Sequence, residues 1–122
     1  MAKLINLKSF KDERGELTVI EKELSFTIKR VYYIYNLNRL DRGFHRHKET
    51  IQAMICISGS CTVFCKKNKD DLQEFILSKP NQYLLINPED YHWMTNFKQN
   101  TIILVLASKS YDVNDYIDKP YE

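Results

Sequence analysis

The sequence lacks long apolar runs and the cysteine pairs typical of stapled or metal-bound folds. No apolar stretch approaches the roughly 18 residues of a membrane-spanning helix, and the N-terminus has no apolar core followed by a small-residue cleavage site. The three cysteines, Cys56, Cys61 and Cys65, have neither zinc-site spacing nor a Cys-x-x-Cys pair. We therefore expect a cytoplasmic protein whose reduced cysteines fill space within strands.

A strong charge of either sign is also absent. The formal net charge is +2, and the lysines and arginines are scattered rather than clustered. This balance does not indicate nucleic acid or a membrane surface as a partner. With 122 residues, 43% of them hydrophobic, the chain is expected to form one globular domain over residues 1–122.

A sustained helical period is missing, and short strand-like segments take its place. Apolar, β-branched and aromatic residues concentrate in segments separated by polar turns, which predicts strands in residues 3–10, 17–20, 28–35, 51–57, 61–65, 72–77, 81–86, 91–97 and 102–107. One short helix is expected from Asn114 onward. Many short strands without a long helix predict an all-β, antiparallel jelly-roll sandwich or barrel.

Two details of strand placement follow from this pattern. The segments 51–57 and 61–65 flank Ser58-Gly59-Ser60, so we expect them to pair as a hairpin. The segments 51–57 and 102–107 are apolar on both faces, so the outer face of one sheet should also be covered. A homodimer is the simplest way to cover it.

Two of the three histidines stand two residues apart in the stretch Arg42-Gly43-Phe44-His45-Arg46-His47. Alternate residues of an extended strand share a face, so His45 and His47 should point the same way. A histidine pair facing one cavity is either part of a metal site or acid/base equipment.

The residues around this pair disfavour a metal. Cupin metal sites follow His-x-His with a Glu about five residues later and a Gly about seven residues after that. Here Gly59 is in register, but Gln52, a neutral and poor ligand, occupies the Glu position. A further ligand could come only from His92, which stands one residue out of step and is therefore expected on the opposite face, as a surface or supporting histidine.

Several motifs, in the same order and spacing, resemble one enzyme family over nearly the whole chain. They are Lys29-Arg30-Val31-Tyr32-Tyr33-Ile34, the histidine stretch with Lys48, Gln52, Ile57-Ser58-Gly59-Ser60-Cys61, Pro80-Asn81-Gln82, Asn96-Phe97, and Leu106-Ala107-Ser108 with Tyr111-Asp112 and Asp115-Tyr116-Ile117. The chain resembles the nucleoside-diphosphate 4-keto-6-deoxyglucose 3,4-ketoisomerases of the WxcM-like cupin family. The resemblance implies a homodimeric cupin-type jelly roll that acts on dTDP-4-keto-6-deoxyglucose without metal or organic cofactor.

Catalytic roles follow from the resemblance together with the chemistry. Moving a carbonyl from C4 to C3 needs a base for the C3 proton and an acid that returns a proton to C4. By position, His47 is expected to be the base and His45 its partner. Tyr33 matches the active-site tyrosine of the family, and strand alternation places it with Val31 and Tyr35, opposite Tyr32 and Ile34.

Substrate binding is assigned to three residues. The diphosphate needs cationic donors, for which Arg42 and Arg14 are the candidates ahead of Lys48, Arg30 and Arg46. Gln52 is grouped with them as a substrate-binding residue. Two departures from the family are Arg46, where a small residue is usual, and Tyr91, where Trp is frequent; they are expected to alter contacts at the dimer or mouth and stacking on the substrate.

Three alternatives stay open at this point. A sugar-nucleotide epimerase would return the proton to the carbon that lost it, a metal-dependent cupin would need a bound cation, and a non-catalytic sugar-binding cupin would need no base. The residues do not decide between a gluco and a galacto product. A role in deoxysugar biosynthesis for surface polysaccharide, such as lipopolysaccharide, follows only from the resemblance.

Overall fold

The computed structural model describes residues 1–122 and consists of strands with a single 3-10 turn. Its elements are β1 (Lys3–Asn6), β2 (Ser9–Asp12), β3 (Gly15–Thr18), β4 (Arg30–Ile34), β5 (Arg42–His47), β6 (Gln52–Ser58), β7 (Cys61–Lys66), β8 (Leu72–Leu77), β9 (Gln82–Ile86), β10 (Tyr91–Thr95), β11 (Ile102–Ala107), η1 (Val113–Asp115) and β12 (Tyr116–Ile117). No helix in the structure is long and apolar enough to cross a membrane.

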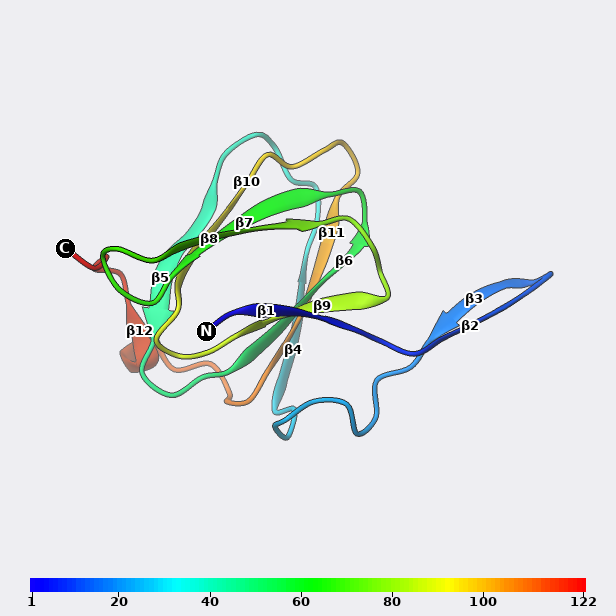
Figure 1. The fold of residues 1–122 in the computed structure, drawn as a ribbon, viewed down its shortest axis with the longest axis horizontal. Helices are drawn as coiled ribbons and strands as arrows, with labels where there is room; N and C mark the ends of the chain where they lie inside the picture. The colour runs from blue at the N-terminus through cyan, green and yellow to red at the C-terminus, as the bar shows by residue number, and fades with distance from the viewer.

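Two five-stranded antiparallel sheets pack face to face. One has the order β1-β9-β6-β11-β4 and the other β12-β5-β10-β7-β8. The remaining strands, β2 and β3, form a separate hairpin that extends away from both sheets (Figure 1). The all-β, antiparallel architecture expected from the sequence is therefore confirmed.

The main core fills the space between the sheets. In β7 every second residue belongs to it: Cys61, Val63 and Cys65 are buried and the residues between them are less so. Met54, Leu84 and other apolar side chains from the opposite sheet meet them. All three cysteines are buried free thiols, which confirms their expected place inside strands.

A second apolar cluster covers the outer face of the β1-β9-β6-β11-β4 sheet. Ala53, Ile55 and Leu106 point outward from β6 and β11 and are nevertheless buried. They are covered by Ile20 and by other side chains of the segment between β3 and β4, namely Leu24 and Phe26. Strands apolar on both faces were therefore correctly predicted to be covered on both sides, and part of that cover comes from the same chain.

Cover is missing over the edge strand β4. Val31, Tyr33 and Tyr35 on its outer face are all more than half exposed, while Tyr32 and Ile34 pack against the core. The predicted alternation along this strand is confirmed. Because the sequence offers no sign of which face is the inner one, the side on which each set would lie could not be predicted.

Three expectations were wrong. Residues 3–10 do not form one strand, because β1 pairs with β9 whereas β2 pairs with β3 in the separate hairpin. β6 and β7 do not pair as a hairpin: β6 lies between β9 and β11, and β7 lies between β10 and β8 in the other sheet. The turn at Gly59 instead carries the chain from one sheet to the other. The helix expected from Asn114 is only the turn Val113–Asp115, because the next residues leave it to pair with β5.

The turn at Gly59 yields a stability prediction. Gly59 has φ +78°, and an added Cβ would overlap Oγ1 of Thr101 and lie 2.8 Å from its Cα. Thr101 is buried, and its Oγ1 accepts a hydrogen bond from the Ser60 N–H (3.2 Å). We expect Gly59→Ala to lower the free energy of unfolding by at least about 2 kcal/mol in urea denaturation.

Gly15→Ala is the matched control for this change. Gly15 also has a positive φ, +134°, but an added Cβ there meets nothing within 4 Å. Gly15→Ala should lower the free energy of unfolding by less than Gly59→Ala does, because it adds backbone strain but no steric overlap. Equal losses in the two variants would contradict the overlap at Thr101.

Candidate active site

The three histidines of the chain meet inside the sandwich. The ring centroid of His45 lies 5.1 Å from that of His47 and 4.9 Å from that of His92, and the rings of His47 and His92 are 6.2 Å apart. His45 and His47 share a face of β5, as predicted. The expectation that His92 would lie on the opposite face was wrong: it is buried and points inward from β10.

A bulge in β5 arranges this cluster. His45 stands opposite His92, but Gly43 stands opposite Trp93, so Phe44 is the extra residue. Gly43 and Phe44 both have positive φ, +100° and +63°. A Cβ on Gly43 would lie 3.0 Å from the His92 carbonyl oxygen, so glycine permits this close approach of the two strands.

The bulge also changes the side on which Arg42 lies. Three residues separate Arg42 from His45, so a regular strand would place them on opposite faces. After the bulge Arg42 stands opposite Met94, which is part of the core. Arg42 therefore lies on the same side of β5 as His45, so both can contact one substrate.

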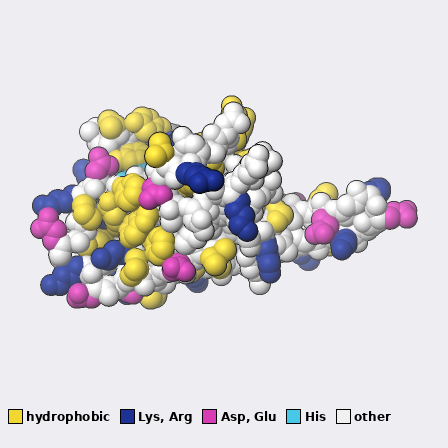
Figure 2. Space-filling model, turned by 90° about the horizontal axis from the view of Figure 1, so that it is seen from above, with side chains coloured by type: hydrophobic (Ala, Val, Ile, Leu, Met, Phe, Trp, Pro, Cys, Tyr) yellow, Lys and Arg dark blue, Asp and Glu magenta, His cyan; other side chains and the backbone are white.

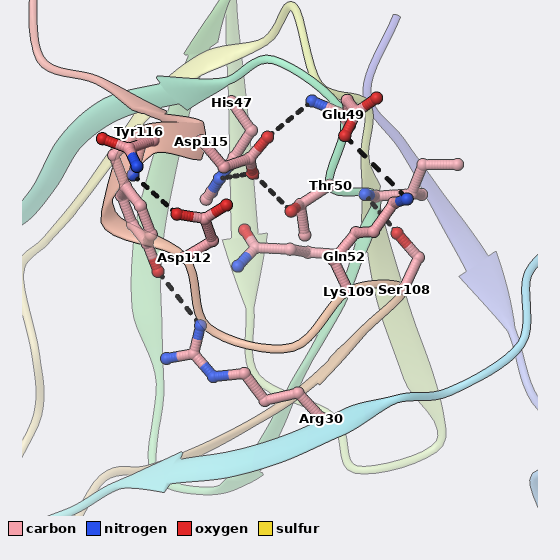
Figure 3. A network of polar contacts seen from close by, with 12 residues as sticks. Arg30, His47, Glu49, Thr50, Gln52, Ser108, Lys109, Asp112, Asp115 and Tyr116 are labelled. Atoms are coloured by element: carbon pink, nitrogen blue, oxygen red, sulfur yellow. Dashed lines mark hydrogen bonds and ion pairs between the residues drawn. The ribbon is translucent and has the colours of Figure 1, made fainter.

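Asp115 holds His47 in one orientation (Figure 3). Its Oδ2 accepts hydrogen bonds from His47 Nδ1 (3.0 Å) and from the Thr50 hydroxyl (2.5 Å), and its Oδ1 accepts one from the Glu49 N–H (2.8 Å). Burial alone would raise the pKa of Asp115, but these hydrogen bonds outweigh it and lower the pKa. The carboxylate is thus ionised and accepts the Nδ1 proton, which leaves Nε2 of His47 with a free lone pair.

Burial keeps all three imidazoles neutral at pH 7. It lowers the pKa of His47, partly opposed by Asp115, and lowers the pKa of His45, with a further lowering from the nearby His47. The pKa of His92 falls to about 3 because the ring is fully buried. His92 Nδ1 lies 3.0 Å from the Asp90 carbonyl oxygen, to which it donates, so its Nε2 also carries a lone pair.

A cavity of about 400 Å³ opens beside the cluster, between β4 of one sheet and β5 and β12 of the other. His45 and His92 line it, while His47 lies behind them. Its lining contains two arginines and no aspartate or glutamate; the residues are Arg30, Tyr32, Tyr33, Ile34, Tyr35, Arg42, Gly43, His45, Met54, His92, Met94 and Tyr116. A larger open depression of about 1020 Å³ over residues 37–39 and 95–99 contains no histidine.

The cavity has cations without counter-charges. Neither Arg30 nor Arg42 has a carboxylate within ion-pair distance. The Arg30 guanidinium lies 4.5 Å from the centre of the Tyr32 ring and donates a hydrogen bond to the Tyr116 hydroxyl (3.1 Å). An anionic ligand would supply the missing negative charge.

Tyr116 and Tyr32 connect these cations with the histidines. The Tyr116 ring lies 5.0 Å from His45 and 4.6 Å from His47. The Tyr32 hydroxyl accepts a hydrogen bond from Gln52 Nε2 (3.0 Å), so its own proton remains available to a ligand. Gln52 is buried and does not line the cavity, and its Oε1 has no partner.

The sequence-based candidates are distributed unevenly. His45 and Arg42 line the cavity, His47 lies behind His45, and Gln52 is linked to the cavity by its hydrogen bond to Tyr32. Tyr33 borders the cavity, but its ring is 64% exposed on the outer face and stacks on Tyr35 at 5.8 Å. Tyr32 holds the inner position in its place.

Arg14 lies far from this cavity. It occupies the turn of the β2–β3 hairpin, where it pairs with Asp12 (2.6 Å) in solvent. The hairpin projects from one end of the body (Figure 2), so Arg14 cannot reach the cavity of its own chain.

Sequence reasoning missed several residues of the site. Asp115 and Tyr116 stand in the sequence only within the motifs of the resemblance, and Arg30 is a weaker candidate for the diphosphate than Arg42 and Arg14. Asp115 is separated from His47 by 68 residues, and no spacing rule links them. The one available signal was the run Asp112-x-x-Asp115-Tyr116 in a polar tail.

The side chains around the histidine cluster do not form a metal site. No group of three or more His, Cys, Asp or Glu side chains has the geometry of a metal site. Gln52, at the Glu position of metal-binding cupins, turns its Nε2 to Tyr32.

Comparisons with known proteins place the chain in a family. The FdtA family model, described as WxcM-like, C-terminal, matches residues 1–122. A TDP-4-oxo-6-deoxy-alpha-D-glucose-3,4-oxoisomerase of Aneurinibacillus thermoaerophilus is 42% identical over 118 residues, which cover 94% of this chain and 84% of that protein.

Solved structures agree in fold. QdtA, a sugar 3,4-ketoisomerase from Thermoanaerobacterium thermosaccharolyticum solved in complex with TDP, superposes with a TM-score of 0.93 at 38% identity, covering 97% of this chain and 88% of that one. The TDP-quinovose 3,4-ketoisomerase WlaRB from Campylobacter jejuni has a TM-score of 0.92 at 37% identity, covering 97% and 92%.

A more distant structure shares the fold alone. A dTDP-4-dehydrorhamnose 3,5-epimerase from Bacillus anthracis has a TM-score of 0.81 at 20% identity, covering 94% of this chain and 76% of that one. The expected cupin-type jelly roll is confirmed by these neighbours. With a match over its whole length and relatives above 30% identity, the chain belongs to the FdtA family, WxcM-like, C-terminal.

Proposed function

We propose that the protein is a sugar-nucleotide 3,4-ketoisomerase that converts dTDP-4-keto-6-deoxyglucose to a dTDP-3-keto-6-deoxyhexose. The observation that carries the proposal is the pair His45, half-buried, and His47, buried, both neutral and next to a cavity that is lined by two arginines and no carboxylate. The similarity to a 3,4-oxoisomerase at 42% identity supports the same reaction over the epimerase alternative.

The cations of the cavity suit the nucleotide. A diphosphate carries about two negative charges and binds best to guanidinium groups that are not already paired with a carboxylate. Arg42 and Arg30 both line the cavity without such a partner, and Arg30 is held in place by tyrosine side chains. We therefore assign the diphosphate to this pair, with Arg30 taking a larger share than its sequence context suggested.

The reaction breaks the C–H bond at C3 and forms one at C4, while the hydroxyl proton at C3 is lost and O4 gains one. A neutral imidazole removes the C3 proton, which the C4 carbonyl acidifies, and the C3–H electrons form the C3–C4 double bond of an enediolate. Protonation at O4 gives the enediol. Loss of the proton from the C3 hydroxyl and addition of a proton at C4 then leave the carbonyl at C3, so no electron enters or leaves the substrate.

His45 and His47 divide this work. Asp115 orients His47 so that its free Nε2 points into the cluster, which supports the assignment of His47 as the base. His45 stands between His47 and the cavity. It would therefore contact the sugar and pass the proton between the sugar and His47. Tyr32 donates its hydroxyl proton to the developing oxyanion, with Gln52 behind it. A contact of Tyr33 with the substrate at the cavity mouth remains a prediction.

A homodimer would complete this site. The hairpin residues Phe10 and Leu17 are more than half exposed, and so are the aromatic residues on the outer face of β4. A second copy would bury both surfaces. Because the hairpin carries Arg14 away from its own body, Arg14 would bind the nucleotide in the cavity of the partner.

The wider setting is proposed on chemical grounds. One domain, residues 1–122, would carry the activity in the cytoplasm, where three free thiols stay reduced. The 3-keto product would feed deoxysugar biosynthesis for surface polysaccharide or lipopolysaccharide.

Solvent isotope exchange tests the reaction. We expect the protein, incubated with dTDP-4-keto-6-deoxyglucose in heavy water, to shift the carbonyl from C4 to C3 while deuterium appears at C4, as followed by NMR of the ring. Exchange at C3 without carbonyl movement would indicate an epimerase. A persistent C3 proton with tight nucleotide binding would indicate a binding protein and refute the isomerase.

His47→Asn and His45→Asn serve as controls in the same assay. Each should lower turnover by about 100-fold or more, since general acid–base catalysis contributes about that much, with binding of TDP little changed. Normal turnover of His47→Asn would show that the base is another residue.

The pH dependence follows from the lowered pKa values. Because burial keeps the pKa of His45 and His47 below the ordinary 6.5, kcat/KM should stay high as pH falls through 6.5 and decline only at lower pH, where the folded-state imidazoles gain protons. Asp115→Asn should move this decline to still lower pH, because the carboxylate raises the pKa of His47, and should lower kcat by about 100-fold.

Asp71→Asn is the control for removing a carboxylate. Asp71 pairs only with Lys67 on the surface, at 3.9 Å, so its pH profile should match that of the parent protein. A decline centred above pH 6.5 in the parent protein would contradict the neutral, buried histidine pair.

Subunit complementation tests the role of the hairpin. We expect a dimer by sedimentation velocity, and Arg14→Ala should raise KM about tenfold or more through loss of a charged hydrogen bond. Co-refolding equal amounts of Arg14→Ala and His47→Asn should restore about one quarter of parent activity at low substrate, since half the dimers are mixed and each has one intact site. No recovery would show that Arg14 does not act across the dimer.

A further inference from the structure

The C-terminal segment beyond β12 is tied back to the loop that precedes β10. The hydroxyl of Tyr121 donates a hydrogen bond to the Glu89 carbonyl oxygen at 2.7 Å. The guanidinium of Arg46 lies 4.3 Å from the centre of the Tyr121 ring, and its Nη1 donates to the Tyr121 hydroxyl at 3.3 Å. None of these three residues lines the cavity.

The loop that receives Tyr121 also holds two of the histidines. Three consecutive carbonyl groups in it each accept one hydrogen bond. Pro88 accepts from the backbone N–H of His47 (2.9 Å), Glu89 accepts from Tyr121, and Asp90 accepts from the ring of His92 (3.0 Å). The loop therefore fixes the backbone of β5, the end of the chain and the ring of His92 together.

The segment anchored by Tyr121 carries the residues that orient the histidines. β12 pairs with β5 through only two residues, Tyr116 opposite His47 and Ile117 opposite Arg46. So short a ladder contributes little by itself. The Asp115 carbonyl oxygen also accepts a hydrogen bond from the Lys48 N–H (2.9 Å), which anchors the start of the segment, while Tyr121 anchors its end. The positions of the Asp115 carboxylate and the Tyr116 ring depend on both anchors.

Arg46 is committed to this anchor. It stands between the two histidines in sequence, and its Nε is buried without a hydrogen-bond partner. The ring and hydroxyl of Tyr121 are the groups that hold its guanidinium. The Arg46 guanidinium therefore contacts the C-terminal segment and not the cavity.

We propose that Tyr121, together with Arg46 and the Glu89 carbonyl, is a latch that positions Asp115 and Tyr116 against the catalytic histidines. Tyr121 is a positioning residue, since it touches neither the cavity nor the histidine rings. The inference rests on the proposed ketoisomerase reaction for its kinetic effect. Its structural effect on His47 does not depend on that reaction.

Two variants of Tyr121 test the latch. Tyr121→Phe removes the hydroxyl and keeps the ring under Arg46, whereas Tyr121→Ala removes both. We expect kcat to fall about 100-fold for Tyr121→Ala, because small misplacements of catalytic groups cost about that much, and less for Tyr121→Phe. KM and the Kd for TDP should change less than about threefold, since Arg30 and Arg42 are untouched.

A second measurement is independent of turnover. Nitrogen-15 NMR of the imidazoles should show His47 protonated at Nδ1 in the parent protein. In Tyr121→Ala its Nδ1 signal should report a mixture of tautomers, and the pKa of His47 should move further down as the support from Asp115 weakens.

Tyr83→Phe is the matched control. The Tyr83 hydroxyl also donates to a main-chain carbonyl, that of Glu23 at 3.2 Å, on the far side of the same fold. It should leave kcat per folded molecule and the His47 signals unchanged.

The outcomes separate the two proposals. If the parent protein does not isomerise the sugar, the proposed function fails, and the His47 tautomer in Tyr121→Ala still decides the latch. Unchanged kcat and unchanged His47 signals in Tyr121→Ala would overturn the latch. So would a parallel loss of kcat and TDP binding in Tyr121→Phe, which would mark a general structural role.

Discussion

The hydrogen bond between His47 Nδ1 and Asp115 Oδ2 is the interaction on which the rest of the site depends. It joins β5 to the C-terminal segment across 68 residues of sequence, and it determines which nitrogen of His47 carries the proton. The Thr50 hydroxyl and the Glu49 N–H satisfy the other acceptor positions of the carboxylate, so it stays ionised although it is largely buried. If Asp115 were protonated or displaced, the His47 ring could rotate, and Nε2 would no longer be held as the unprotonated nitrogen that accepts a proton.

Neutral imidazoles and positively charged guanidinium groups lie next to each other in this site. The sandwich core lowers the pKa of each histidine and so supplies neutral imidazoles, while Arg30 and Arg42 face the adjoining cavity without a carboxylate partner. A ligand with a diphosphate at one end and an acidic C–H at the other complements both features. The bulge at Phe44 makes the combination possible, because it turns Arg42 to the side of the strand that His45 occupies.

Local sequence patterns predicted the strands well and their partners less well. The nine segments called extended all contain strands, and the alternation of Tyr32 against Tyr33 holds in β4. The pairing of β6 with β7 failed because a glycine turn can join two strands of one sheet or of two facing sheets, and the hydrophobic pattern is the same in both. The motif spacing predicts the wrong face for His92, because its face follows from its neighbours Cys65, opposite it in β7, and Met94, two residues on, which both face the core.

The sequence by itself determined the fold class, the shared face of His45 and His47, and the absence of a Glu at position 52. These depend on residue type and on the two-residue period of a strand, which are local properties. Only the tertiary structure decided that Tyr32 and not Tyr33 faces the interior, that His92 joins the histidine pair, and that Asp115 orients His47. Each of these depends on which distant segment packs against the strand, and that is settled by packing of the whole chain rather than by spacing along it.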